Sequence, residues 1–103
     1  YTSPTDFHSF TVSGGSTQAD VIVGTVAAGV TSKLAAVFAA NNVNGFNNGT
    51  VGIADTVGSA ATGLTIIRVG MNDASTSQAN GFFKIFSIWG LALLDVTLDT
   101  LTT

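Results

Sequence analysis

The feature that most constrains the fold of this chain is the apolar run GFFKIFSIWGLALLDVTL, residues 81–98. It concentrates aromatic and long aliphatic side chains near the C-terminus. The run is too long for one ordinary β-strand of about 5–6 residues. A glycine inside a strand pattern often marks a bulge or bend. The run therefore predicts two strands, or one strand bent at Gly90.

The two halves of this run differ in their alternation. Before Gly90 both alternate sets of residues are apolar, which is typical of a strand that is covered on both sides. From Asp95 to Asp99 polar and apolar residues alternate, which predicts a half-buried strand with one face in water. Three leucines, Leu91, Leu94 and Leu98, have helical spacing. The many aromatic and β-branched residues nevertheless favour a pleated surface.

Shorter apolar stretches upstream predict further strands separated by turns. Strands are expected at residues 7–12, 19–26, 50–54 and 64–71. The Gly-Gly step in residues 13–17 is typical of a turn, because glycine tolerates positive φ. Residues 41–49 read as an asparagine-rich loop, and their two Asn-Gly steps are preferred in type I′ hairpin turns. Residues 72–80 are polar and read as a surface loop.

The stretch at residues 32–40 is ambiguous. Its alanines and the spacing of Leu34, Val37 and Phe38 suit a short helix. The alternation of Leu34, Ala36 and Phe38 suits a strand, which we favour because the rest of the pattern is β. The fold class expected is therefore all-β: a single-domain antiparallel β-sandwich or small barrel of about seven or eight short strands. At most one short helix is expected, near residues 32–40.

The N-terminus differs from the rest of the chain. Residues 1–6 are polar and hold the only proline, so they predict an extended arm ahead of a single domain at residues 7–103. A chain of 103 residues can bury a real core. The first strand could close the domain's own sheet, or it could pair with the sheet edge of a neighbouring copy.

Charge is unusually scarce in this sequence. Charged residues make up 9% of the chain, against about 25% in an average soluble domain, and 46% of the residues are hydrophobic. A small monomer has much surface for its volume and normally keeps that surface soluble with charge. We therefore expect other subunits to cover part of the apolar surface. The alternative is a neutral extracellular domain, rich in Ser, Thr and Asn, that lives as a monomer.

The composition also argues against several classes of function. The three basic residues, Lys33, Arg68 and Lys84, are scattered, whereas nucleic-acid binding needs clustered Lys and Arg. The uncharged stretch at residues 85–94 is shorter than the roughly 20 residues of a membrane-spanning helix. Without cysteine, the chain can form neither disulfides nor zinc–thiolate sites. We expect no nucleic-acid partner and no membrane insertion by this chain.

No motif predicts catalysis, a metal or a cofactor. His8 is the only histidine, and nothing marks Ser9 and Asp6 beside it as parts of a catalytic triad. Asp95 and Asp99 would share a strand face, where such a pair reads as a solvated edge. No EF-hand or phosphate-loop spacing is present. The sequon at Asn48 makes that residue a candidate for glycosylation.

Candidate subunit-interface residues come from the apolar run and the first strand. Aromatic residues concentrate binding energy at interfaces, and Trp89 shares an apolar strand face with two leucines. Trp89 and its face-mates could instead be ordinary core. The candidate interface residues are Trp89, Leu91, Leu93, Phe83, Phe7 and Phe10.

These patterns favour a non-enzymatic structural subunit over a named activity. Its expected partners are other copies of itself and, in one form, a second structural chain. It would self-assemble into an extracellular filament or pilus, in one form as the β-rich globular chain beside a separate helical chain, or into a virion shell or decoration layer. The alternative is a secreted β-sandwich binding module for a carbohydrate or protein. The expected location is extracellular, on the cell surface or on a virion.

Overall fold

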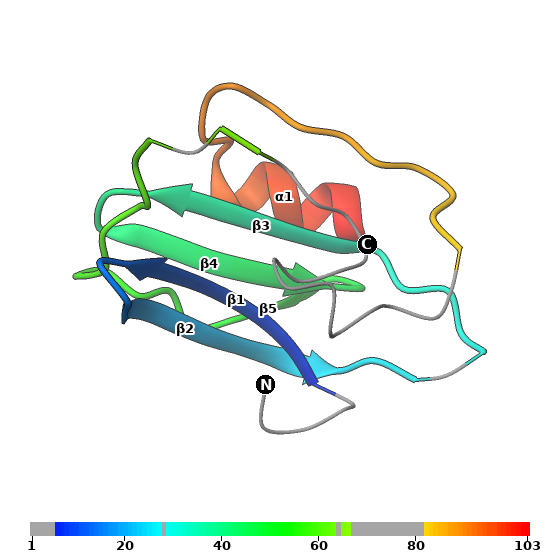
Figure 1. The fold of residues 1–103 in the computed structure, drawn as a ribbon. Coiled ribbons are helices and arrows are strands. Elements are labelled where there is room, and N and C mark those ends of the chain that lie inside the picture. The colour runs from blue at the N-terminus through cyan, green and yellow to red at the C-terminus, as the bar shows by residue number, and fades with distance from the viewer. Residues whose placement is uncertain (1–5, 28, 64, 67–81) are drawn as a thin grey trace.

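The structure, a computed structural model, describes residues 6–27, 29–63, 65–66 and 82–103, and its fold is mostly β (Figure 1). It contains β1 (Asp6–Ser13), β2 (Ser16–Thr25), β3 (Leu34–Ala39), β4 (Asn42–Asn47), β5 (Thr50–Val51) and α1 (Asp95–Thr102). The expected all-β character is confirmed in this coarse form. A sandwich of seven or eight strands is not confirmed, because the described residues hold five strands in two small sheets.

The first sheet is the antiparallel hairpin β1-β2. Its turn is the predicted Gly-Gly step, with Gly14 and Gly15 at φ 59° and 78°, where L residues are strained. Alternate residues of β2 are buried: Ala19, Val21 and Val23. This hairpin confirms the strands predicted at residues 7–12 and 19–26.

The second sheet has the order β3-β4-β5, with antiparallel pairs. Residues 34–39 form a strand, so the helical alternative for residues 32–40 is wrong. The Asn48-Gly49 step turns β4 into β5, with φ of 48° and 76°, as expected of a type I′ turn. Of the strand predicted at residues 50–54, only Thr50–Val51 is a strand in the structure. An isolated bridge between Val43 and Asp55 follows it.

The central strand is β4, which the sequence pattern assigned to a loop. Its residues 43–47 are all buried, because the β1-β2 sheet covers one face and α1 covers the other. Val43 packs with Ala19, Val21 and Val23 of β2. On the opposite face, Phe46 packs with Val37 of β3 and Leu98 of α1. The molecule therefore has three layers, with β4 in the middle one.

The prediction for the apolar run is wrong in both halves. Residues 82–94 form no strand, and Asp95–Thr102 is the helix α1, whose buried residues are Leu98 and Thr102. The helix docks on the sheet through Leu98, whose side chain is buried against Val37 and Phe46. Of the arm predicted at residues 1–6, residues 1–5 lie outside the described residues and Asp6 begins β1. The loop predicted at residues 72–80 and most of the strand predicted at residues 64–71 also lie outside the described residues. Residues 65–66 are in no strand.

Candidate assembly surface

Residues 82–94, here called the apolar segment, run as an extended coil along the outside of the molecule (Figure 1). Its large side chains are exposed, from 103% of the reference area at Phe82 and 84% at Leu91 to 50% at Trp89. Between described residues, no backbone hydrogen bond uses residues 82–93. The most strand-prone stretch of the chain thus pairs with no strand of the described residues. Its exposed large side chains are Phe82, Phe83, Ile85, Phe86, Ile88, Trp89, Leu91 and Leu94.

The C-terminal end of the apolar segment is firmly attached to the sheet. Leu93 packs against the cluster of Val37, Phe46 and Leu98. Two residues later, the Asp95 carboxylate accepts hydrogen bonds from Asn42 Nδ2 at 3.2 Å and from Asn44 Nδ2 at 3.0 Å. Asp95 also lies in the first turn of α1, where a negative charge is stabilised by the helix dipole. These contacts fix the place where the exposed segment leaves the core.

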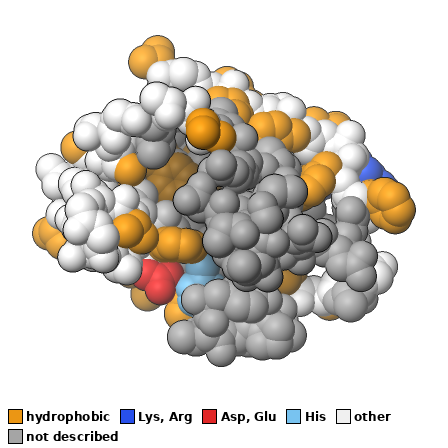
Figure 2. Space-filling model, viewed as in Figure 1, with side chains coloured by type: hydrophobic (Ala, Val, Ile, Leu, Met, Phe, Trp, Pro, Cys, Tyr) orange, Lys and Arg blue, Asp and Glu red, His pale blue; other side chains and the backbone are white. Residues whose placement is uncertain are grey.

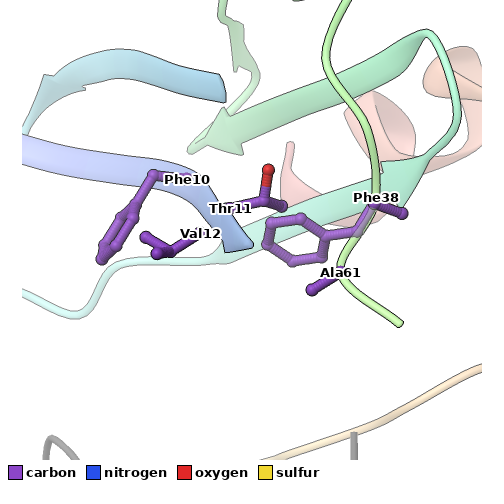
Figure 3. A pocket seen from close by; sticks show the side chains of 6 residues that line it. Phe10, Thr11, Val12, Phe38 and Ala61 are labelled. Carbon is purple, nitrogen blue, oxygen red and sulfur yellow. The ribbon is translucent and has the colours of Figure 1, made fainter. Parts of the chain in front are cut away.

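A second apolar surface lies where β1 and β3 end. An open pocket of about 390 Å³ is lined there by Phe10, Thr11, Val12, Phe38, Ala60 and Ala61. Figure 3 shows Val12 between the two phenyl rings, with Ala61 below the Phe38 ring. Phe10, Val12 and Phe38 are each about half exposed. We call these three side chains and the pocket between them the phenylalanine pocket.

The strand pattern explains why the phenylalanine pocket faces water. On β1, Ser9 and Thr11 point inward, donating hydrogen bonds to the carbonyl oxygens of Asn44 and Ser59, both at 3.0 Å. Phe10 and Val12 therefore occupy the outer face of the strand. Phe38 pairs with Val43 across the β3-β4 ladder but remains about half exposed. The usual arrangement of polar residues outside and apolar residues inside is thus inverted at residues 9–12 of β1, although Phe7 of the same strand packs against the core.

Charge is sparse around both surfaces. Lys84 is the sole charged residue of the apolar segment, and none of the described residues lining the pocket is charged. Asp20 lies directly opposite Phe10 in the β1-β2 register, and its Oδ1 is 2.9 Å from His8 Nδ1. Figure 2 shows the same scarcity on one face, where hydrophobic side chains outnumber the few charged ones that are visible.

The predicted interface residues fall into three groups. Phe83, Trp89 and Leu91 are exposed on the apolar segment, and Phe10 lines the phenylalanine pocket. Leu93 and Phe7 instead pack against the two core clusters. Val12 and Phe38 were missed as interface residues, although the alternation of Leu34, Ala36 and Phe38 had favoured a strand.

The remaining candidate residues do not form a catalytic arrangement among the described residues. His8 contacts Asp20, whereas Ser9 points to the opposite face and donates to Asn44. Asp95 and Asp99 lie on a helix and not on a strand face, which corrects that expectation. Asn48 is exposed on its turn, where its Oδ1 accepts a hydrogen bond from the Lys33 backbone N–H at 2.8 Å.

The described residues contain no group of three or more His, Cys, Asp or Glu side chains placed to hold a metal ion. Within the same residues, no helix combines the length and the apolar character needed to cross a membrane.

Comparisons with known proteins found no matching family model, no similar curated protein and no similar solved structure.

Proposed function

We propose that this protein is a non-enzymatic structural subunit that self-assembles, and that the exposed apolar segment carries the assembly. The object built would be an extracellular filament or pilus, or a virion shell or decoration layer. The observation that supports the proposal most directly is the exposure of eight large apolar side chains within residues 82–94. Large amounts of exposed apolar surface mark interaction sites in soluble proteins.

The area involved suits a stable interface. Eight side chains at the observed exposures offer roughly 1,000 Å² of surface, while a standard protein–protein interface buries about 800 Å² per partner. Burying this surface between subunits would remove it from water and give the strand-prone residues a partner. The alternative to such burial is a monomer that carries this patch with only 9% charged residues.

The proposal is tested by measuring the mass and shape of the purified protein. Light scattering after size-exclusion chromatography, together with negative-stain microscopy, should show filaments, shells or large oligomers. The variant Leu91→Asp should be monomeric, because it places a charge within the buried contact. Ile53→Asp is the matched control, since Ile53 is equally exposed but lies outside the segment and the pocket. A wild-type chain that remains monomeric at high concentration would overturn the proposal.

A further inference from the structure

The apolar segment and the phenylalanine pocket are two separate surfaces on the same chain. None of the described residues lining the pocket belongs to residues 82–94, and both surfaces stay exposed. We propose that the apolar segment of one copy binds the phenylalanine pocket of a second copy. This inference rests on the proposed function and specifies which surfaces meet.

The chemistry of the two surfaces is complementary. The pocket is apolar and holds two phenyl rings, and the segment carries three phenylalanines and the single tryptophan. Aromatic side chains that enter an apolar pocket supply much of the binding energy at protein interfaces. A volume of about 390 Å³ can accept such side chains.

The few charges present support the same pairing. Lys84 lies within the segment, and Asp20 lies beside Phe10 on the outer face of the β1-β2 sheet. The Asp20 side chain is 48% exposed although it contacts His8. When the segment of one copy docks, the positive charge of its Lys84 could be balanced by the Asp20 carboxylate of the copy that holds it. The other described cation, Lys33, donates from Nζ to the Thr103 carbonyl oxygen at 2.7 Å.

The proposed contact is heterologous: each copy binds one neighbour through its segment and another neighbour through its pocket. Each copy that binds through its segment still presents an open pocket, and each copy that binds through its pocket still presents a segment. Such head-to-tail contacts form rings when the rotation between copies closes and open filaments when it does not. If two copies instead exchanged their segments reciprocally about a two-fold axis, both surfaces of each copy would be covered in a closed dimer.

Mixing two defective variants tests this arrangement. Leu91→Asp disables the segment, and Phe10→Asp disables the pocket, so each variant alone should be monomeric. Mixed in equal amounts, they retain one intact segment and one intact pocket, and should form two-chain complexes but no larger assemblies. Ala61→Trp fills the pocket from a different residue and serves as the second pocket variant if Phe10→Asp does not fold. Circular dichroism checks the fold of each variant.

The outcomes separate this inference from the proposed function. If both pocket variants assemble like the wild type while Leu91→Asp does not, the segment binds elsewhere and the inference is overturned, although self-assembly stands. If the two variants stay monomeric when mixed, head-to-tail docking is also overturned. If the wild type itself never assembles, the proposed function fails as well.

Discussion

Asn44 Nδ2 lies 3.0 Å from Asp95 Oδ2 and so joins the central strand β4 to the first residue of α1. Asn44 is buried, with 2% of its surface exposed, and Asn42 donates to the other oxygen of the same carboxylate. The residue before the helix, Leu94, offers no side-chain cap. The two asparagine amides thus fix the helix start and, with it, the end of the apolar segment.

Replacing Asn44 by Ala should destabilise the protein by about 1–3 kcal/mol, the cost of leaving a buried partner of a charged group unsatisfied. Urea unfolding would measure the loss. Asn42→Ala is the matched control, because Asn42 is only half buried and its bond is longer, so its loss should be smaller. Equal and negligible effects of both variants would contradict the anchoring role of these amides.

Gly45 is expected to resist substitution for a packing reason. A Cβ atom there would lie 2.6 Å from Val23 Cγ2, so the two sheets could not keep their present separation. Gly45→Ala should cost about 1–3 kcal/mol through overpacking, and Val23→Ala in the same chain should relieve part of the clash. Gly90→Ala, with nothing within 4 Å of the added atom, should change stability by less than about 0.5 kcal/mol. Similar melting temperatures for Gly45→Ala and Gly90→Ala would refute this packing.

Leu98 tests the docking of α1. It is buried against Val37 and Phe46, so Leu98→Ala should lose about 2–5 kcal/mol of unfolding free energy. Leu101 lies on the same helix but is 52% exposed, and Leu101→Ala should have a much smaller effect. Chemical denaturation of the two variants gives the comparison. A larger loss for Leu101→Ala would show that the helix packs through a different face.

Exchange of the Lys84 and Asp20 charges tests the orientation of the docked segment. Lys84→Asp should weaken assembly, because it places two carboxylates at the contact. Adding Asp20→Lys in the same chain should restore assembly, since every junction then has opposite charges again. Sedimentation velocity of the single and double variants measures the assembled fraction. If the double variant assembles no better than Lys84→Asp alone, these two residues do not meet.

The parts of the fold that follow local rules could be predicted from sequence. Gly14-Gly15 and Asn48-Gly49 form hairpin turns because their positive φ angles suit these residues, and the alternation in β2 is reflected in its burial. The β4 strand was missed because asparagine is depleted in strands. In β4 the asparagine side chains donate hydrogen bonds to groups distant in sequence. Asn44 donates to Asp95, and Asn47 donates to the carbonyl oxygens of Val23 and Thr25.

The apolar run shows the opposite error, because its sequence pattern predicted strands that residues 82–94 do not form. Residues 82–94 have the composition of a strand, but a strand also needs a neighbour for its backbone hydrogen bonds, and composition cannot supply one. Of the three helically spaced leucines, only Leu98 lies in α1, whereas Leu94 precedes the helix and is 73% exposed, so their spacing did not locate the helix. The two surfaces of the candidate site were only half predicted, because Phe38 and Phe10 come together through tertiary packing.

The most direct test is chemical cross-linking between two single-cysteine variants. Each variant carries one reactive thiol, because the sequence contains no cysteine. Ser87→Cys places a thiol on the apolar segment, and Ala61→Cys places one in the phenylalanine pocket. After mixing and treatment with a short bismaleimide, segment-to-pocket docking predicts a heterodimer between these two chains as the main product. Ile53→Cys in place of Ala61→Cys should give only background. A Ser87–Ala61 yield no higher than that background, in a sample that still assembles, would contradict docking of the segment in the pocket.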